Sequence, residues 1–302
     1  MSSPLRTEQL TKVFPCVEAL HNLTIDVPEG SVFTLMGANG AGKTTAIKTV
    51  LNIHSPTSGW AEVVGTDSRS LAAHQFAQIG YVSENQQIPG WMTVGYFLSY
   101  ARNFYPHWRD EDAAELVRLY ELPLNRTLNA LSRGMRLKAM LAAALAFRPR
   151  LIVLDEPFSG LDVLVREQLV ESILARTPEA TVFLASHDLA EIDSFATHIA
   201  YLNAGRLAFV DEIGTLLDRF REIEITLDVA RDLPTELPSN WLLPDQSGAV
   251  VRFVDSHFDA DRTPAEIRRR FPAPREVMAR AMPLRSIALA LAKSAKTLEA
   301  SK

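Results

Sequence analysis

The chain has 302 residues, of which 47% are hydrophobic and 22% are charged, and these globular proportions exclude a disordered or fibrous protein. Its formal net charge of -5 lacks the overall positive charge that is typical of nucleic-acid-binding proteins. Its single cysteine excludes a disulfide scaffold or a cysteine-based zinc cluster. The longest apolar run, residues 139–147, is shorter than the ~20 residues that cross a bilayer, and residues 1–12 have no signal-peptide core. We therefore expect a soluble, cytosolic protein of about two domains.

The first predicted elements are a strand, a glycine-rich loop and a helix, in that order. Residues 31–36 form a β-prone run, residues 37–44 read GANGAGKT, and residues 45–51 are compatible with a helix. This order matches the phosphate-binding P-loop motif, G-x-x-x-x-G-K-[ST], in its proper context. Glycines let successive backbone N–H groups point at a phosphate, and the positive end of the helix adds to that field. The alternative is a glycine-rich turn without a chemical role, and the eight matching positions argue against it.

Particular residues of this loop have predicted roles. Lys43 can reach the β- and γ-phosphates of a nucleotide, and the hydroxyl of Thr44 can bind Mg²⁺. The other candidate nucleotide-binding residues of this segment are Gly37, Ala38, Asn39, Gly40, Ala41, Gly42 and Thr45. A P-loop alone does not distinguish small-molecule kinases, GTPases and motor ATPases.

A later strand ends in a pair of acids. Residues 151–154 read LIVL, which suits a strand buried on both faces of a parallel sheet, and Asp155 and Glu156 follow. Ligands of open α/β sheets bind at the carboxyl ends of strands, so these acids are expected beside the P-loop. Asp155 suits contact with Mg²⁺, and Glu156 suits orienting or deprotonating a water molecule. Alone, such a pair is more often a solvated loop start, so this interpretation depends on the P-loop.

His187 follows another predicted strand, residues 181–185, and is expected at the same edge of the sheet. Its position alone does not separate a functional histidine from a surface residue. Ser186 or Asp188 could instead cap the helix that follows.

Residues 131–136, LSRGMR, precede a predicted helix at residues 137–147. Ser132 is a good N-cap, and the free N–H groups at a helix start attract anions. The segment is therefore a second candidate phosphate-binding site. The alternative is an ordinary capped helix without a ligand.

Together these segments resemble the ATPase subunit of an ABC transporter, over about residues 5–219. Residues 131–135 match the signature pentapeptide of that family, usually LSGGQ, and His187 matches its switch histidine. Residues 79–84 match the segment that normally ends in the Q-loop glutamine. The remaining matches are Phe14, where an aromatic residue stacks on adenine, and Asp162, in a segment that resembles the D-loop.

The resemblance implies ATP and Mg²⁺ as cofactors and assigns the site residues. Lys43, Glu156 and His187 are the expected catalytic residues, and Thr44, Glu84 and Asp155 are the expected metal ligands. In the family, ATP lies between the P-loop of one chain and the signature helix of another. This chain carries one set of motifs, so a homodimer or a heterodimer with a similar ATPase subunit is expected. Ser132, Gly134 and Asp162 then join the nucleotide site.

Some positions depart from the family pattern. Glu84 replaces the glutamine of the Q-loop, and a carboxylate can coordinate a cation but cannot donate as an amide does. Arg133 replaces the first signature glycine and could point to a partner chain or to solvent, and Met135 replaces the signature glutamine. Phe14 is a purely apolar stacking residue. Ser132 is retained and still offers its hydroxyl.

The predicted fold is α/β, a P-loop NTPase core with an antiparallel β edge and a helical subdomain, followed by a small α+β tail. The ATPase domain is expected at residues 1–219, with the helical subdomain at about 85–148, and the accessory domain at 220–302. In the tail, strands near 223–227 and 249–254 and helices at 263–271 and 283–293 flank a proline-rich stretch.

We therefore expect an ATP-hydrolysing subunit that lies on the cytoplasmic face of the cell membrane and acts through a separate transmembrane permease subunit, without a nucleic-acid partner. In the family the helical subdomain contacts the permease, and residues 86–92 are the expected edge of that contact. The tail loosely resembles those of bacterial exporter ATPases, which favours export. The alternatives are a soluble ABC-type mechanical ATPase acting on ribosomes or nucleic acid, and a P-loop small-molecule kinase, which needs a phosphoryl acceptor.

Overall fold

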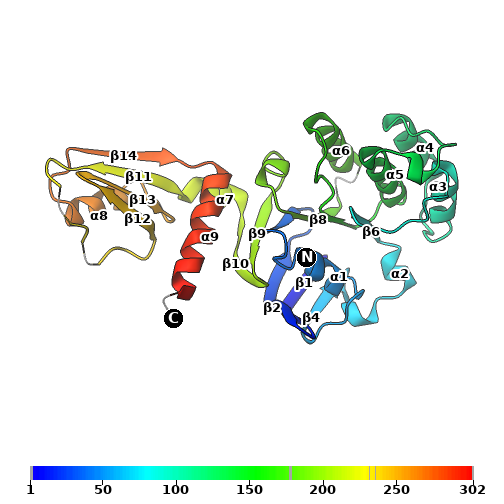
Figure 1. Cartoon of the computed structure of the whole chain (residues 1–302), viewed down its shortest axis with the longest axis horizontal. Helices are drawn as coiled ribbons and strands as arrows, with labels where there is room; N and C mark the ends of the chain where they lie inside the picture. The colour runs from blue at the N-terminus through cyan, green and yellow to red at the C-terminus, as the bar shows by residue number, and fades with distance from the viewer. Residues whose placement is uncertain (1–2, 177–178, 231, 235, 301–302) are drawn as a thin grey trace. The chain divides into compact units, whose positions relative to one another are not determined.

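The computed structural model describes residues 3–300 apart from 177–178, 231 and 235, and these residues form two compact units. The first unit covers residues 1–207 and the second covers residues 208–302 (Figure 1). This boundary is one of packing, and the division into functional domains after residue 219 stays a prediction. In the described part of the chain, no helix combines the length and the apolarity that crossing a membrane requires.

A largely parallel sheet forms the centre of the first unit. Its strands are β3 (Val32–Met36), β6 (Ile79–Ser83), β7 (Leu151–Asp155), β8 (Thr181–Ser186) and β9 (His198–Asn203). The sheet also includes β10 (Arg206–Glu212), which continues past residue 207 into the second unit. They lie in the order β10-β9-β3-β8-β7-β6, and the pairs from β9 to β6 are parallel. Strands β3, β7 and β8 are buried at every residue, which is typical of parallel strands covered on both faces.

The register of this sheet brings the ends of β3, β7 and β8 to one edge. Met36 at the end of β3 pairs with Ser186 at the end of β8, and Asp155 at the end of β7 pairs with Ala185. Ligands of parallel sheets bind beyond the carboxyl ends of the strands. The residues that follow these strands, including the loop that begins at Gly37, therefore meet at the same edge.

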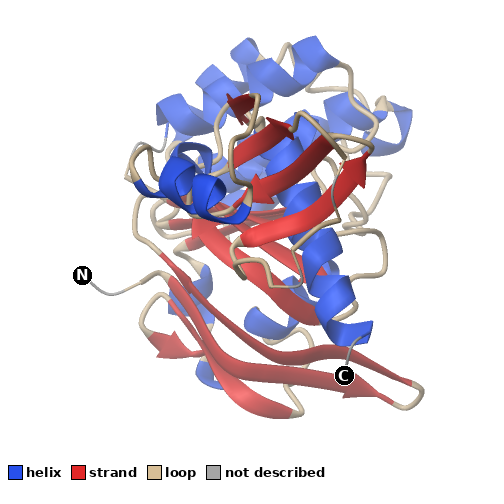
Figure 2. Ribbon diagram, turned by 90° about the vertical axis from the view of Figure 1, so that its left-hand side faces the viewer, coloured by secondary structure: helices blue, strands red, loops and turns tan. Residues whose placement is uncertain are grey.

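Helix α1 (Lys43–Val50) has the central sheet on one side and an antiparallel sheet on the other. This antiparallel sheet confirms the predicted β edge. Its strands are β1 (Leu5–Phe14), β2 (Val17–Val27), β4 (Ser58–Val63) and β5 (Thr66–Asp67). They lie in the order β2-β1-β4-β5, and β1 and β2 form a long hairpin (Figure 2). Leu23 of β2, Phe33 of β3 and Ile47 of α1 belong to one buried cluster. Burial of these apolar side chains fixes α1 between the two sheets.

Helices pack beside the β6 end of the central sheet. Those within the predicted helical subdomain, residues 85–148, are α3 (Val94–Arg102), α4 (Asp110–Leu119) and α5 (Arg133–Leu145). Outside that range are α2 (Ala73–Phe76) and α6 (Val163–Arg176). α5 contacts β6, α3, α4 and α6. It begins at Arg133, earlier than the predicted start at residue 137, because the Ser132 side chain caps it. The Ser132 Oγ accepts a hydrogen bond from the Met135 N–H at 3.3 Å.

The second unit is a small α+β structure, as predicted for the tail. Its elements are α7 (Ile213–Arg219), β11 (Arg221–Thr226), β12 (Trp241–Ser247), β13 (Val250–Asp255), α8 (Arg262–Arg270), β14 (Glu276–Ala281) and α9 (Leu284–Ala300). The strands form an antiparallel sheet in the order β12-β13-β11-β14 (Figure 2). Ile223 of β11, Phe253 of β13 and Ile267 of α8 share one core, so α8 covers one face of this sheet.

Strands β12 and β14 were not predicted from the sequence pattern. β12 contains Pro244, which cannot donate a backbone hydrogen bond. It is tolerated because β12 is an edge strand with a bulge between Leu242 and Asp245, where Leu243 has a φ angle of 51°. β14 is exposed along nearly its whole length, so it lacks the alternation of a half-buried strand.

Candidate functional site

The loop between β3 and α1 has the conformation that a phosphate-binding loop requires. Gly40 and Gly42 have φ angles of 81° and 107°, in the left-handed region that favours glycine. A Cβ atom at Gly42 would lie 2.5 Å from the carbonyl oxygen of Ala19, so only glycine fits there. The tight curl leads directly into α1, whose first N–H groups have no acceptor within the helix. Such a loop and helix start form a site for an anion.

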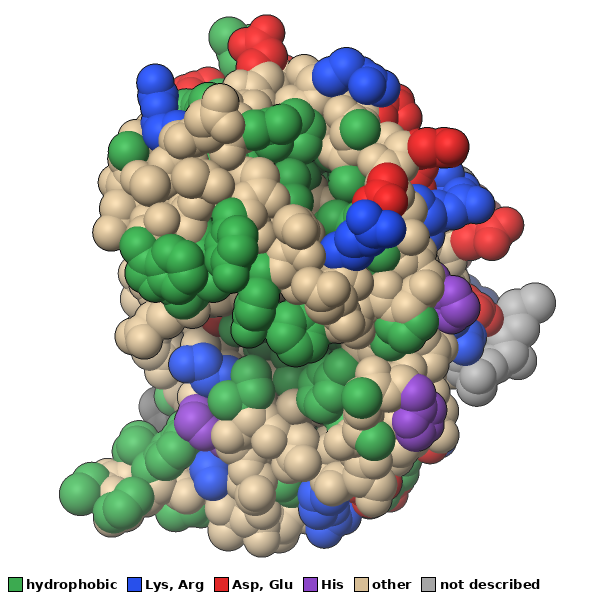
Figure 3. All heavy atoms as spheres, turned by 90° about the vertical axis from the view of Figure 1, so that its right-hand side faces the viewer, with side chains coloured by type: hydrophobic (Ala, Val, Ile, Leu, Met, Phe, Trp, Pro, Cys, Tyr) green, Lys and Arg blue, Asp and Glu red, His purple; other side chains and the backbone are tan. Residues whose placement is uncertain are grey.

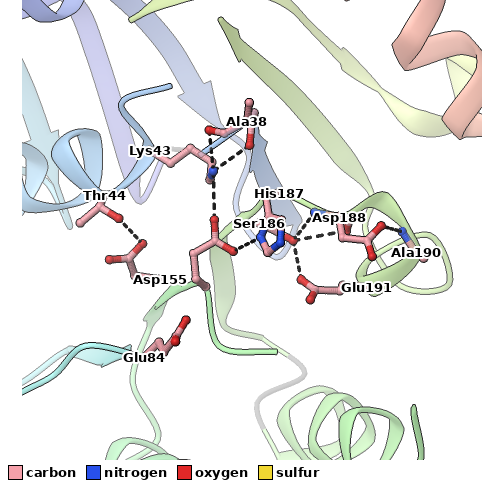
Figure 4. Close-up of polar contacts among 12 residues, drawn as sticks. Ala38, Lys43, Thr44, Glu84, Asp155, Ser186, His187, Asp188, Ala190 and Glu191 are labelled. Carbon is pink, nitrogen blue, oxygen red and sulfur yellow. Dashed lines mark hydrogen bonds and ion pairs between the residues drawn. The ribbon is translucent and has the colours of Figure 1, made fainter. Parts of the chain in front are cut away.

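Lys43 is buried at the start of α1, with 5% of its surface exposed. Its Nζ donates to the carbonyl oxygens of Gly37 at 2.7 Å and Ala38 at 3.1 Å, and it forms an ion pair with Glu156 Oε1 at 3.0 Å (Figure 4). An ammonium group has three donors, so these acceptors use its full capacity. The partners compensate for the burial of the charge.

Glu156 links Lys43 to His187 at the ends of neighbouring strands. His187 Nδ1 donates a hydrogen bond to Glu156 Oε2 at 2.7 Å, and Glu156 N–H donates to the Ala185 carbonyl oxygen at 3.1 Å. Glu156 has a φ angle of 51°, which is uncommon outside glycine. The hydrogen bond to Glu156 raises the pKa of His187, because it favours the charged imidazolium. The carboxylate therefore lies between two basic groups, in a position that suits the handling of a water molecule.

Asp155 lies beside the P-loop and holds the hydroxyl of Thr44. Thr44 Oγ1 donates to Asp155 Oδ1 at 2.9 Å, and Ser83 Oγ donates to Oδ2 at 3.3 Å. Asp155 is 3% exposed, and this burial raises its pKa. Within the described ranges, no group of three or more histidine, cysteine, aspartate or glutamate residues could hold a metal ion. The oxygen pair of Thr44 and Asp155 nevertheless fits Mg²⁺, which takes one or two protein ligands together with phosphates and water.

Lys43, Thr44, Glu156 and His187 line one cavity of about 750 Å³. Asp155 is not among the lining residues and contacts the site through Thr44. Phe14 lies on its wall, where its ring packs edge-to-face on His54 with the centroids 5.5 Å apart. Lys12 Nζ lies 4.9 Å from the centroid of the Phe14 ring. The predicted site residues that line the cavity are Phe14, Asn39, Gly40, Gly42, Lys43, Thr44, Thr45, Glu84, Glu156 and His187.

Ser132, Gly134 and Asp162 are not among the described residues that line this cavity. Ser132 caps α5, and Asp162 Oδ1 accepts a hydrogen bond from the Val165 N–H at 3.0 Å at the start of α6. A Cβ atom at Gly134 would lie 3.5 Å from Leu161 Cδ2, so the first turn of α5 packs against the loop before α6. Ser132 and Gly134 at the start of α5 and Asp162 before α6 therefore lie near one another. None of them lines the cavity at the P-loop of the same chain.

The two charged departures from the family pattern contact each other. Arg133 Nη2 lies 2.5 Å from Glu84 Oε1, so the side chain that could have pointed to a partner or to solvent is directed at Glu84. The two positions lie far apart in the chain, and the sequence pattern predicts no contact between them. Their opposite charges were the signal that could have linked them.

Buried polar residues near His187 were not singled out from the sequence. Glu191 is 7% exposed and accepts a hydrogen bond from Ser186 Oγ at 2.5 Å. Burial raises the pKa of Glu191. The sequence predicts Ser186 only as a possible helix cap, and a buried glutamate in a short turn after a strand has no distinctive sequence pattern. This contact supports the loop that carries His187.

Comparison with known proteins identifies the family. The model of the ABC transporter family matches residues 20–159. The bacitracin transport ATP-binding protein BcrA of Bacillus licheniformis is 30% identical over 268 residues, which cover 86% of this chain and 81% of that protein. The chain belongs to the ABC transporter ATP-binding proteins. The BcrA protein of Enterococcus faecalis is 29% identical over 283 residues, which cover 90% of this chain and 89% of that protein.

A solved structure of an ABC transporter ATP-binding subunit has a similar fold. An ATP-binding subunit of an ABC transporter matches with a TM-score of 0.66 and 25% identity, covering 72% of this chain and 92% of that structure. The predicted P-loop ATPase fold and the predicted family are therefore confirmed. This ABC ATPase binds ATP, as its family does, while the roles of individual residues stay predictions.

Proposed function

We propose that Lys43, Glu156 and His187 carry out the ATP hydrolysis by which this ABC ATPase drives transport through a separate membrane permease. The observation that carries the proposal is the contact chain from Lys43 through Glu156 to His187, which lies in one cavity with the P-loop. The same arrangement provides positive charge for phosphates and a carboxylate for a water molecule.

In the proposed reaction Lys43 moves its hydrogen bonds from the loop carbonyls to the β- and γ-phosphate oxygens of ATP. Phe14 stacks on the adenine at the wall of the cavity. Glu156, released from Lys43, orients and deprotonates the attacking water. His187 keeps the Glu156 carboxylate in place, and its raised pKa favours the protonated ring that can donate to it.

Thr44 and Asp155 are the proposed ligands of Mg²⁺, with Glu84 as a further candidate on the same cavity. When bound, the ion neutralises charge on the phosphates. Thr44 Oγ1 and Asp155 Oδ1 lie 2.9 Å apart, so both oxygen atoms would be available to hold one ion. Glu84 is paired with Arg133 through Oε1, so its second carboxylate oxygen would be the one to hold the ion.

A second ATPase chain is proposed to complete the nucleotide site. Ser132 and Gly134 begin α5 and Asp162 precedes α6, outside the cavity formed by their own P-loop. Facing the P-loop of another chain, the helix start at Ser132 offers N–H groups and a hydroxyl to the γ-phosphate. The partner is a second copy of this chain or a similar ATPase subunit.

An exposed aromatic surface on α3 and the segments that flank it supports a membrane partner. Its side chains are between 47% and 67% exposed and belong to Trp91, Tyr96, Tyr100 and Phe104. Figure 3 shows hydrophobic side chains gathered on the face of the molecule where α3 and its neighbours lie. Gln86 lies in a groove beside Tyr100 and Phe104, and its buried Oε1 has no hydrogen-bond partner among the described residues. This groove is where we propose that a segment of the permease docks.

Export is the proposed direction of transport. The similarity to the bacitracin transport ATP-binding proteins covers 86–90% of the chain and therefore continues into the second unit. The tail in turn loosely resembles those of bacterial exporter ATPases. The chain is accordingly proposed to lie on the cytoplasmic face of the cell membrane, bound to its permease.

Two measurements test this function. The purified chain should release phosphate from Mg-ATP with water as the only acceptor, which a small-molecule kinase would not do. A tagged chain should copurify with a multi-spanning membrane protein, and replacing Tyr100 and Phe104 together by serine should weaken that capture. Phe76→Ser, at a 40% exposed aromatic residue of α2, is the matched control that should not. Recovery of ribosomes in place of a membrane protein would contradict the transport function.

A further inference from the structure

The loop after β6 and the start of α5 are joined by a charge pair at the edge of the nucleotide cavity. Glu84 follows β6 and lines the cavity, and its N–H donates to the Asp155 carbonyl oxygen at 3.1 Å. Its Oε1 lies 2.5 Å from Nη2 of Arg133, the first residue of α5. Figure 4 shows Glu84 next to Asp155, on the side away from Lys43. The carboxylate of Glu84 thus belongs to the nucleotide site and to an ion pair at the same time.

The guanidinium of Arg133 also lies against the loop before α6. A Cβ atom at Gly160 would lie 2.9 Å from Arg133 Nη1, so the guanidinium lies directly against the backbone of this glycine. One turn along α5, Arg136 Nη2 donates to the carbonyl oxygens of Gln86 at 3.5 Å and Ile88 at 3.4 Å. The start of α5 therefore holds the loop after β6 through both arginines, and among the described residues Arg133 is the one that pairs with a carboxylate there.

A carboxylate in this position works against the binding of a polyphosphate. ATP brings several negative charges into the cavity, whose lining already includes the carboxylates of Glu18, Glu84 and Glu156. Glu18 pairs with His21. Glu156 is balanced by Lys43 and His187. Arg133 is the group that balances Glu84. Glu84 is 30% exposed and Arg133 is 48% exposed, so the effect is moderate and is screened by salt.

We propose that Arg133 acts as an intramolecular counter-charge, which makes a glutamate at position 84 compatible with nucleotide binding. Nucleotide binding therefore depends on the pair: removing Arg133 leaves the Glu84 charge unbalanced beside the phosphates. Since Arg133 belongs to α5, a movement of α5 away from the loop after β6 uncovers the Glu84 charge and lowers nucleotide affinity. This inference rests on the proposed nucleotide site and adds a charge-coupled link between that site and the helical layer.

The test is a cycle of charge-removing variants: Glu84→Gln, Arg133→Gln and the double variant. Dissociation constants for ATP are measured by calorimetry with the full chain, at low salt and in EDTA, so that no metal ion contributes. Arg133→Gln should weaken binding about fivefold, or about 1 kcal/mol, the upper range for exposed ion pairs. Glu84→Gln should bind at least as well as the wild type. The double variant should return to within about twofold of the wild type, because the uncompensated charge is gone.

Controls separate charge from structure. Arg133→Lys keeps the charge and should retain affinity within about twofold, even if Arg133→Gln folds poorly. Arg136→Gln removes an arginine from the same helix, and any loss that it causes should persist when Glu84→Gln is added. Unchanged binding by Arg133→Gln, or a loss that persists in the double variant, would overturn the counter-charge. Failure of the wild-type chain to bind ATP at all would instead overturn the proposed nucleotide site.

Discussion

Replacement of Glu156 by glutamine tests the proposed chemistry most directly. The amide keeps the shape of the side chain but loses the charge that contacts Lys43 at 3.0 Å and His187 at 2.7 Å. It cannot accept a proton from water, so the general-base contribution of about 10²–10⁴-fold disappears from turnover. We expect phosphate release to fall by at least about 100-fold.

ATP binding should survive the same change. Lys43 is 5% exposed and loses its only carboxylate partner in the described structure, so its charge is more available to phosphates. We expect the affinity for ATP to stay within about threefold of the wild type or to increase, on the scale of a single ion pair. Bound ATP that is not hydrolysed should accumulate in the dimer of ATPase chains.

The assay combines phosphate release, ATP binding by calorimetry and size-exclusion chromatography with Mg-ATP. Glu167→Gln, at an exposed glutamate on α6, is the matched control and should resemble the wild type. Turnover of Glu156→Gln within about threefold of the wild type would refute the role of Glu156 as the base. Loss of ATP binding along with turnover would show that the carboxylate serves the structure of the loop instead.

Further predictions concern the same loop and its surroundings. Lys43→Ala should weaken ATP binding at least about tenfold in calorimetry, since the only buried cation of the P-loop is removed, and unchanged affinity would exclude Lys43 from the site. The pKa of His187 is raised by Glu156, so their contact should stabilise the fold fully below pH ~6.5 and lose that effect as pH rises through the raised pKa. His187→Gln should accordingly cost less than about 1 kcal/mol of unfolding free energy at low pH and nothing at high pH, and a pH-independent cost would contradict the linkage. Gly42→Ala should lower the unfolding free energy by about 2 kcal/mol or more in denaturant titrations, because its Cβ collides with Ala19, whereas Gly40→Ala is strained by φ alone and should lose less.

The parts of the fold that sequence predicts best are contiguous and local. The strand at Val32–Met36, the P-loop and the start of α1 follow one another, so their pattern is complete within a short segment. The buried strands β7 and β8 are also predictable, because each is a continuous apolar run. Their common edge follows from the general rule for ligands of parallel sheets.

Features that depend on tertiary contacts could not be predicted from the sequence. β12 is a strand despite Pro244, because an edge position and a bulge remove the need for its N–H. The contact of Glu84 with Arg133 joins segments far apart in the chain, and only the packing of α5 beside β6 brings them together. The burial of Glu191 against Ser186 likewise results from the turn that follows β8.

The contacts of Lys43 affect how nucleotide affinity should be understood. The ammonium has acceptors in Gly37, Ala38 and Glu156, so an incoming phosphate exchanges partners with the chain and does not meet a bare charge. The measured dissociation constant is therefore a difference between two well-satisfied arrangements of the same lysine. Nucleotide analogues whose phosphates reach this ammonium with poorer geometry should bind more weakly than their charge alone would suggest. The carbonyl oxygens of the loop and the Glu156 carboxylate compete with them for the same N–H donors.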